Sequence, residues 1–264
     1  MKRHPLVEPF WRSQAHFCAG SLPVDLSPEL KAGVAAHVAA TIELRKGETL
    51  IHTGMPYQHI YLVTGGAFKS VQLGEDGQSQ VISFHWPREF MGLGGFSRRS
   101  HTTDLVALTT PALVCEFPIH AFDARTTVAS PLLALLLEYV SEGLAQAEYD
   151  QFMLGSLSAT QKISSFFLQT QHKLRRAGMN ADVFELPMTR EEIGSYLGLT
   201  METVSRLLTH LRVHGVAEVD KKWVRILRAD ILHAWQVDGD ERFLGHRPGP
   251  VLGAGHCDFR KDAA

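Results

Sequence analysis

Six polar side chains follow one face of a predicted helix near the C-terminal end of the sequence: Glu202, Thr203, Ser205, Arg206, Thr209 and His210. They are short or forked, and together they donate and accept hydrogen bonds. Base edges in the major groove of DNA present donors and acceptors that such side chains can pair with. On the opposite face, apolar residues recur at helical spacing and are predicted to face a core: Met201, Val204, Leu207, Leu208 and Leu211. This two-faced pattern is typical of a recognition helix.

A second, shorter helix is predicted just before this one. Thr189 can cap its first turn, and Glu192, three residues on, completes the spacing of a capping box. Gly198 interrupts the helical pattern, and Thr200 can cap the recognition helix. We count both threonines, Thr189 and Thr200, among the candidate DNA contacts. The plainer alternative is an αα-hairpin with a solvated polar face.

The segment after the recognition helix favours DNA binding over that alternative. Residues 216–219 and 223–227 are typical of two short strands joined by a polar turn. A hairpin in this place is the wing of a winged helix. Lys221 and Lys222 at its tip, with Arg225 beside them, are candidates for phosphate contacts.

Composition limits the classes of protein that the sequence can belong to. The chain has 264 residues, 45% of them hydrophobic and 20% charged, which suits two modest soluble domains. No apolar run reaches about 18 residues, and no signal peptide is recognised, so we expect a cytoplasmic protein without a membrane span. The net charge of −2 argues against a non-specific coat on nucleic acid.

Cysteines and histidines give little sign of bonded or liganded clusters. Cys18, Cys115 and Cys257 lie far apart, which predicts separate thiols in a reducing compartment. The 14 histidines are interpreted as scattered, so that no two share one helix face and no metal is expected. We recognise no P-loop, no nucleophile elbow and no helix with paired metal ligands, and therefore do not expect an enzyme.

Short β-like runs alternate with glycine turns between residues 40 and 118, which predicts a sandwich or barrel of short strands. Residues 75–78 are typical of a hairpin turn. We therefore expect an α+β protein made of five parts: an N-terminal arm (1–25), a β-roll resembling a cyclic-nucleotide-binding jelly roll (26–130), a dimerisation helix (131–157), a winged helix-turn-helix domain (158–237) and a flexible tail (238–264).

The dimerisation helix is predicted from a heptad-like seam with residue spacings of 4, 3, 4, 3, 4 and 3. Its seven positions are Leu133, Leu137, Val140, Leu144, Ala147, Gln151 and Leu154. The alternative is an ordinary helix packed against its own domain. A second amphipathic helix, residues 159–178, is predicted to turn Ile163, Phe166 and Phe167 inward.

This order of parts, together with residues 46–54, 60–70, 113–118 and 188–208, resembles the Crp/Fnr superfamily of bacterial transcription regulators, and within it the fumarate-nitrate regulator branch. The resemblance implies that Glu202, Ser205 and Arg206, in an E-x-x-S-R pattern, read a DNA half-site. It also implies a homodimer on a palindrome similar to TTGAT, four bases and ATCAA, and RNA polymerase as a partner.

Two departures from the family pattern concern cofactors. Oxygen-sensing members hold an iron–sulfur cluster with four cysteines, whereas here Ser21 stands in one of those places and only Cys18 and Cys115 are available. Cys115 is expected to be a small buried hydrophobe. The Gly-Glu and Arg-Ser pairs of cAMP-binding members are not matched in residues 90–96 and 101–105. We therefore expect neither cofactor.

The primary prediction is a homodimeric, sequence-specific transcription regulator. The alternative is an effector-dependent sensor whose roll binds another small molecule, a nucleotide or haem. His85, His101 and His120 lie in or beside the roll, but they are expected to be structural rather than ligands.

Overall fold

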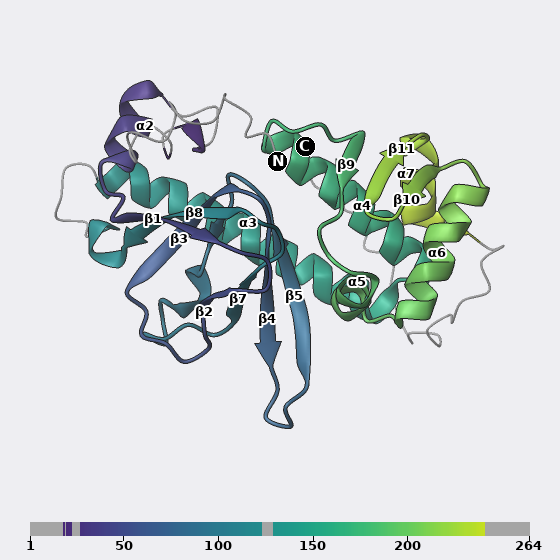
Figure 1. The fold of residues 1–264 in the computed structure, drawn as a ribbon, viewed down its shortest axis with the longest axis horizontal. Helices are drawn as coiled ribbons and strands as arrows, with labels where there is room; N and C mark the ends of the chain where they lie inside the picture. Colours follow the sequence, from purple (N-terminus) through teal and green to yellow (C-terminus); the bar gives the residue numbers. More distant parts are fainter. Residues whose placement is uncertain (1–17, 19, 23–26, 123–128, 241–264) are drawn as a thin grey trace, which may run out of the picture.

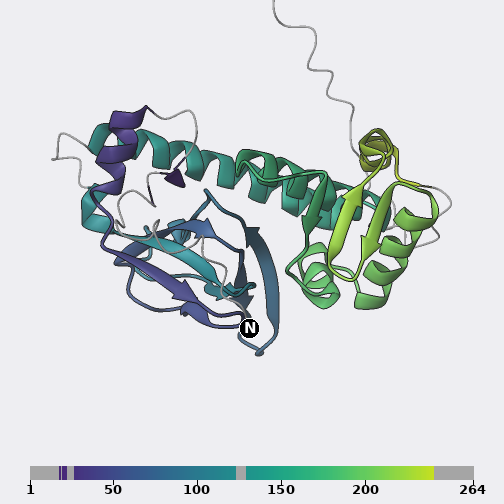
Figure 2. The same ribbon diagram turned by 45° about the horizontal axis from the view of Figure 1, so that its top comes forward.

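The computed structural model describes residues 18, 20–22, 27–122 and 129–240. It shows a β-roll, a long helix and a C-terminal domain in chain order, which confirms the predicted α+β fold (Figure 1). Helix α3, Ala129–Ser156, runs from beside the roll to the C-terminal domain in both views (Figures 1 and 2). Most of the predicted N-terminal arm, and the predicted tail beyond residue 240, lie outside the described residues.

The roll consists of two four-stranded antiparallel sheets. The first has the order β1-β8-β3-β6, formed by Ala40–Leu44, Ala112–Pro118, His59–Gly65 and Phe90–Met91. The second has the order β2-β7-β4-β5, formed by Thr49–Ile51, Asp104–Ala107, Phe68–Leu73 and Ser79–His85. Apolar side chains such as Ile51, Val63, Phe68, Leu105 and Val114 pack together as its core.

Tight turns between the strands explain the glycines of this region. Gly66 has φ +73, and a Cβ there would lie 2.2 Å from Thr109 Oγ1. The predicted hairpin turn at residues 75–78 joins β4 to β5, and Gly77 within it has φ +81. The described part of the N-terminal half also contains the short helices α2 (Pro28–Ala35), η2 (Leu93–Gly95) and η3 (Ile119–Phe122).

The C-terminal domain begins at a break after α3. Ser158 caps α4, Ala159–Arg176, in a capping box with Gln161. Ile163, Phe166 and Phe167 are buried in the domain core, as predicted. Helices α5 (Arg190–Leu197) and α6 (Met201–Val213) follow, and then the wing strands β10 (Ala217–Asp220) and β11 (Trp223–Ile226).

Two elements of this domain were not predicted. Strand β9, Val183–Glu185, pairs with β11 and gives a three-stranded sheet of order β10-β11-β9. Helix α7, Ala229–Asp238, packs against α4. Strand β9 has only three residues, and α7 buries only Leu232 and Trp235, so neither has a strong periodic pattern.

The expectation of three separate thiols is wrong. Cys18 and Cys115 are joined by a disulfide, with their Cα atoms 6.3 Å apart. Both residues are fully buried, beside Leu22, Ile60 and Phe117. Cys115 is therefore buried in β8 as expected, but it is bonded. Sequence distance misled the prediction, because the fold returns the N-terminal segment to a strand 97 residues further along the chain.

Candidate nucleic-acid interface

Helices α5 and α6 are each fixed by a side-chain cap. Thr189 Oγ1 accepts the backbone N–H of Glu192, and the Glu192 carboxylate accepts the N–H of Thr189, as the capping box predicts. Gly198 ends α5 with φ +62, and Thr200 Oγ1 accepts the N–H of Thr203 at the start of α6. The predicted helix-turn-helix is therefore present, with its break at the predicted glycine.

The turn between the helices requires close backbone packing. A Cβ on Gly194 would lie 2.6 Å from the carbonyl oxygen of Leu199, so only glycine fits at that position in α5. On the inner side of α6, Val204, Leu207, Leu208 and Leu211 are buried as predicted. Met201 is not: it is 49% exposed, because it is the first residue of the helix and lies at the edge of the core.

Glu202 and Arg206 lie one turn apart on the outer side of α6, and both are exposed. Neither side chain makes a hydrogen bond or ion pair to any other described residue. Thr203 and Ser205 are half-buried beside them, and Thr209 is exposed. The hydroxyls of Ser205 and Thr209 donate to the carbonyls of Met201 and Ser205, so each oxygen can act towards other groups only as an acceptor.

A further cation stands beside this face. Arg190, the first residue of α5, is exposed, and its Nη1 lies 3.2 Å from Ser205 Oγ. Arg190 was not predicted from the sequence, because its partner Ser205 is 15 residues away. The threonine–arginine pair at positions 189 and 190, directly at the start of a helix-turn-helix, is the signal that could have identified it.

His210 does not lie on the exposed polar face, contrary to the prediction from the sequence. Its side chain is 13% exposed, its Nε2 lies 2.8 Å from Asp240 Oδ2, and its ring stacks on Trp235. A helix turns by about 40° beyond a full circle every four residues. The row of residues that continues from Glu202 and Arg206 therefore points towards helix α7 where it reaches His210.

His210 and His214 are four residues apart and lie together, with ring centroids 4.1 Å apart. The expectation that no two histidines share a helix face is therefore wrong. The signal was in the sequence, as the pair H-x-x-x-H at positions 210–214.

The wing carries its cations at the exposed end. Lys221 has φ +54 in the turn between β10 and β11, is exposed, and forms no ion pair with any described residue. Lys222 and Arg225 are also exposed, but they share their charge with Glu185 at 3.8 Å and Glu218 at 3.4 Å. Lys221 is thus the wing cation best placed to approach a phosphate.

Every position of the predicted seam on α3 is exposed: Leu133, Leu137, Val140, Leu144, Ala147, Gln151 and Leu154. Leu137 is 69% and Leu144 62% exposed, whereas Leu135 and Leu136 turn towards the roll and are buried. Phe152, 55% exposed, lies beside the seam. One protomer therefore exposes a long ridge of apolar side chains that no described residue covers. Most monomeric proteins do not expose apolar patches of this extent.

A small cavity of about 380 Å³ lies where the roll meets α3, between the η2 segment, the residue pair Thr102 and Thr103, and Tyr139 of α3. None of the described residues that line it is a lysine, arginine, aspartate or glutamate. Burial lowers the pKa of His85 in its wall to about 3, with a smaller contribution from the charge of Lys173, so that imidazole stays neutral. The cavity offers no fixed cation to a phosphate.

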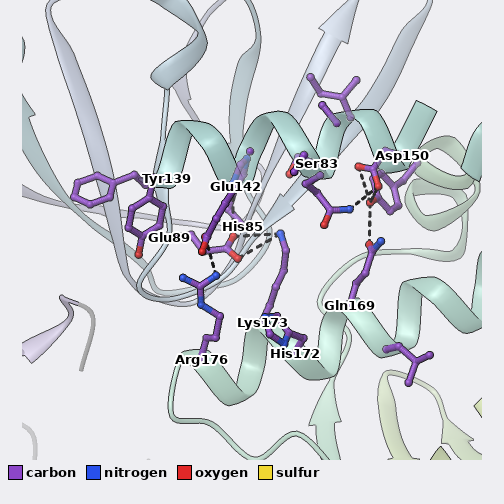
Figure 3. Close-up of a pocket in the computed structure, with 18 of the residues that line it drawn as sticks. Ser83, His85, Glu89, Tyr139, Glu142, Asp150, Gln169, His172, Lys173 and Arg176 are labelled. Carbon is purple, nitrogen blue, oxygen red and sulfur yellow. Dashed lines mark hydrogen bonds and ion pairs between the residues drawn. The ribbon is translucent and has the colours of Figure 1, made fainter. Parts of the chain in front are cut away.

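A larger cavity of about 1390 Å³ lies between β5, α3 and α4. Figure 3 shows charged side chains from both halves of the molecule around it, already paired. Lys173 Nζ lies 3.3 Å from Glu89 Oε1, and Arg176 Nη1 lies 2.8 Å from Glu142 Oε2. Seam residues of α3, including Ala147 and Gln151, also form part of its lining.

A roll, a long connecting helix and a winged helix-turn-helix define a class of DNA-binding regulators, and comparison with known proteins supports the same class. The family of the Crp-like helix-turn-helix domain matches residues 161–235, and that of the cyclic nucleotide-binding domain matches residues 41–125.

The transcriptional activator protein FnrA of Stutzerimonas stutzeri is 33% identical over 184 residues, covering 70% of this chain and 75% of FnrA. The transcriptional activator protein Anr of Pseudomonas aeruginosa is 32% identical over 206 residues, 78% of this chain and 84% of Anr. The structure of FixK2 from Bradyrhizobium japonicum superposes with a TM-score of 0.68 at 29% identity, covering 75% of this chain and 96% of FixK2.

The chain belongs to the Crp/Fnr family of transcription regulators and carries its helix-turn-helix DNA-binding domain. Among the described residues, no helix is both long and apolar enough to cross a membrane.

Proposed function

We propose that this protein regulates transcription as a homodimer that reads a palindromic operator similar to TTGAT, four bases and ATCAA. The observation that carries the proposal is the pair Glu202 and Arg206, exposed and unpaired among the described residues, one turn apart on a capped helix. A charged side chain left free on a rigid helix is available to a base edge without breaking an internal contact.

In this proposal each side chain on α6 has a role set by its chemistry. Arg206 donates two hydrogen bonds to O6 and N7 of guanine, and Glu202 accepts from cytosine N4 or adenine N6. Ser205 and Thr203 add contacts to a base or phosphate. Phosphates are held by the residues around the helix: Thr189, Arg190, Thr200, Lys221 and Lys222. His210 has no role in this readout, because it is engaged with Asp240.

The seam of α3 would form the two-fold interface. Joining two protomers buries the ridge from Leu133 to Leu154, and each buried leucine contributes about 1.5–3 kcal/mol. Gln151 can pair with its symmetry mate and fix the register of the two helices. The two-fold axis then sets two copies of α6 against half-sites about one helical turn apart.

We propose that the protein works without an iron–sulfur cluster and without cAMP. A cubane cluster needs four thiolates, and the two cysteines of the described residues are bonded to each other. A cyclic nucleotide carries a phosphate, and the roll cavity has no lysine or arginine in its described lining. The residues present do not fit either group.

By family resemblance we also propose RNA polymerase as a partner, a cytoplasmic location and no enzymatic activity. The names of FnrA and Anr describe activators, so activation is the proposed output. A second candidate, a regulator that needs a small-molecule effector, is favoured by the cavity between β5, α3 and α4. A ligand there would touch the roll and the helices that lead to the DNA-binding domain.

The test is a gel-shift titration with a duplex that contains the palindrome, in parallel with duplexes in which one or both half-sites are scrambled. We expect tight binding to the intact palindrome in air without any effector, and weaker binding when one half-site is scrambled. Equal affinity for all three duplexes would contradict sequence-specific reading. Binding that appears only with a cell extract's small-molecule fraction would favour the effector-dependent candidate.

A further inference from the structure

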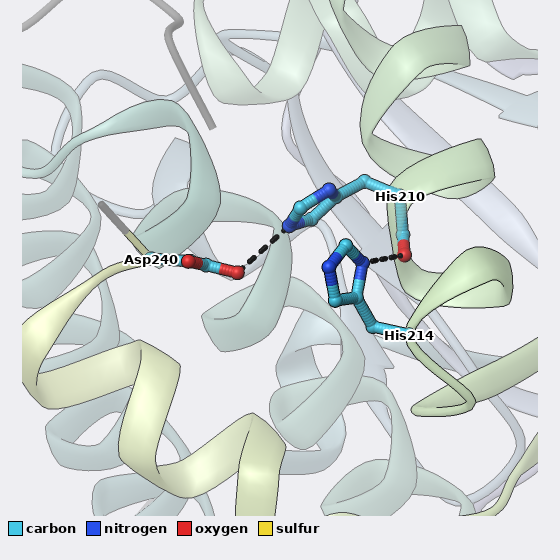
Figure 4. A group of neighbouring side chains, drawn as sticks. All are labelled: His210, His214 and Asp240. Atoms are coloured by element: carbon cyan, nitrogen blue, oxygen red, sulfur yellow. Dashed lines mark hydrogen bonds and ion pairs between the residues drawn. The ribbon is translucent and has the colours of Figure 1, made fainter. Parts of the chain in front are cut away.

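His210, His214 and Asp240 come together at the C-terminal end of the recognition helix. One potential ligand atom from each residue lies within 4.8 Å of the other two. His210 belongs to the last turn of α6, His214 follows that helix, and Asp240 follows α7. The cluster therefore joins the C-terminal ends of two helices (Figure 4).

The two histidines are oriented by a backbone carbonyl and by a neighbouring aromatic ring. His214 Nδ1 lies 3.0 Å from the carbonyl oxygen of His210, a contact in which the nitrogen must donate. That bond leaves the lone pair of His214 on Nε2, the ring nitrogen that Figure 4 shows on the side of Asp240. His210 is held by stacking on Trp235, with centroids 5.1 Å apart. A backbone carbonyl that fixes the tautomer of a histidine is the usual second contact of a metal ligand.

Asp240 supplies a carboxylate in a shielded position. Its side chain is 4% exposed, and its Oδ2 lies 2.8 Å from His210 Nε2. Gly239, with φ +75, turns the chain at the end of α7 and directs Asp240 back to α6. A side chain at residue 239 would meet Ser158 Oγ at 3.3 Å. The backbone is thus shaped to bring this carboxylate to the two imidazoles.

We propose that these three residues bind a divalent transition-metal ion, with Zn²⁺ the best match. Zinc takes imidazole nitrogens and carboxylate oxygens at about 2.0–2.2 Å, in tetrahedral sites whose ligand atoms are about 3.3 Å apart. His210 Nε2 and Asp240 Oδ2, 2.8 Å apart, need to separate slightly. The remaining separations, at most 4.8 Å, need to shorten by up to about 1.5 Å to reach the tetrahedral spacing, within the reach of side-chain rotation. The ion replaces the proton shared by His210 and Asp240, and water fills the fourth position.

The test is a titration of the full-length, metal-free protein with Zn²⁺ in competition with a chromophoric chelator, without DNA. Asp240→Asn keeps a hydrogen-bonding partner for His210 but removes the anionic ligand, and His214→Gln removes one imidazole. His233→Gln, an exposed position on α7, is the matched control. The three variants and the wild type share all other histidines of the chain. Any metal bound at those other histidines therefore contributes equally to all four proteins.

We expect one zinc ion per protomer in the wild type and in His233→Gln, and at least about tenfold weaker binding in the other two variants. Co²⁺ should give the intense visible absorbance of a tetrahedral site in the wild type and control only. Zinc should also raise the melting temperature of the wild type but not that of Asp240→Asn. Equal zinc affinity in all four proteins, or no site that competes with the chelator, would overturn the proposal. Because no step uses DNA, its failure is separate from failure of operator binding.

Discussion

Lys69 on strand β4 of the roll and Glu192 on helix α5 form an ion pair, with Nζ and Oε1 2.6 Å apart. Glu192 is also the carboxylate that caps α5 through Thr189. Glu192 therefore both completes the capping box of α5 and binds the roll through Lys69. Val81 of β5 supports the same contact, because its backbone N–H donates to Ser195 Oγ at 2.9 Å. The β4–β5 hairpin is docked on the first helix of the DNA-binding motif.

Removing Lys69 should weaken this contact. Both side chains are about four-fifths shielded from solvent, so we expect the pair to contribute about 1–2 kcal/mol, between an exposed and a fully buried pair. Lys69→Met and Glu192→Gln, alone and together, give a double-mutant cycle in urea. A coupling free energy near zero would show that the two domains are not held together by this pair.

Lowering the pH should weaken the ion pair between Lys69 and Glu192. Burial raises the pKa of Glu192, but hydrogen bonds from Lys69 and Thr189 and the charge of Lys69 lower it more, so the net pKa is below its usual value. Because the pKa of Glu192 is lower in the folded than in the unfolded protein, its charge stabilises the fold at pH values above the unfolded-state pKa. That stabilisation is lost as the pH falls through the folded-state pKa. We expect wild type to lose more unfolding free energy than Glu192→Gln between pH 6 and about 3.5. Parallel curves for the two proteins would contradict this prediction.

Arg206→Ala should abolish specific reading without unfolding the protein. Arg206 is exposed and its side chain forms no hydrogen bond or ion pair with another described residue, so its truncation opens no buried cavity. A bidentate arginine–guanine contact contributes about 1–3 kcal/mol, and a symmetric dimer loses two. Gel-shift affinity should fall towards that for scrambled DNA, with an unchanged melting curve. His233→Gln, an exposed change on α7 in the same domain, is the control, and it should retain preference for the palindrome.

Leu144→Asp should split the dimer. Leu144 is 62% exposed in one protomer and lies in the middle of the seam, so in the dimer two unpaired carboxylates would face each other near the axis, at a cost of several kcal/mol. Sedimentation at micromolar concentration should show a wild-type dimer and a monomeric variant. Glu148→Asp changes an exposed residue off the seam, and it should leave the dimer intact. A wild type that sediments as a monomer would refute the assigned interface.

The bond between Cys18 and Cys115 should be detected by alkylation in urea. Without reductant only Cys257 should react, and all three cysteines should react after reduction. Cys18→Ser should lower unfolding free energy by about 2–4 kcal/mol, yet leave operator affinity unchanged, because the bond lies in the roll. Three reactive thiols in unreduced protein would show that Cys18 and Cys115 are not bonded.

Local chemistry explains which features could be predicted from the sequence. The caps at Thr189 and Thr200, the break at Gly198 and the buried face of α6 depend on neighbours within one or two turns. The position of His210 depends on α7, and the position of Cys18 on a strand far along the chain. The contact of Lys69 with Glu192 joins residues 123 positions apart. No periodic pattern encodes such long-range contacts, so they had to be observed.

The exposed ridge of α3 has a consequence for inheritance. The residues that would join two protomers are separate from those that would read the operator. A protomer can therefore lose the ability to bind its DNA half-site and still form a dimer. In a cell that makes both forms, a chain with Arg206→Ala would draw intact chains into mixed dimers that hold only one working half-site reader. Such an allele should be dominant over the wild type, and adding Leu144→Asp to it should make it recessive.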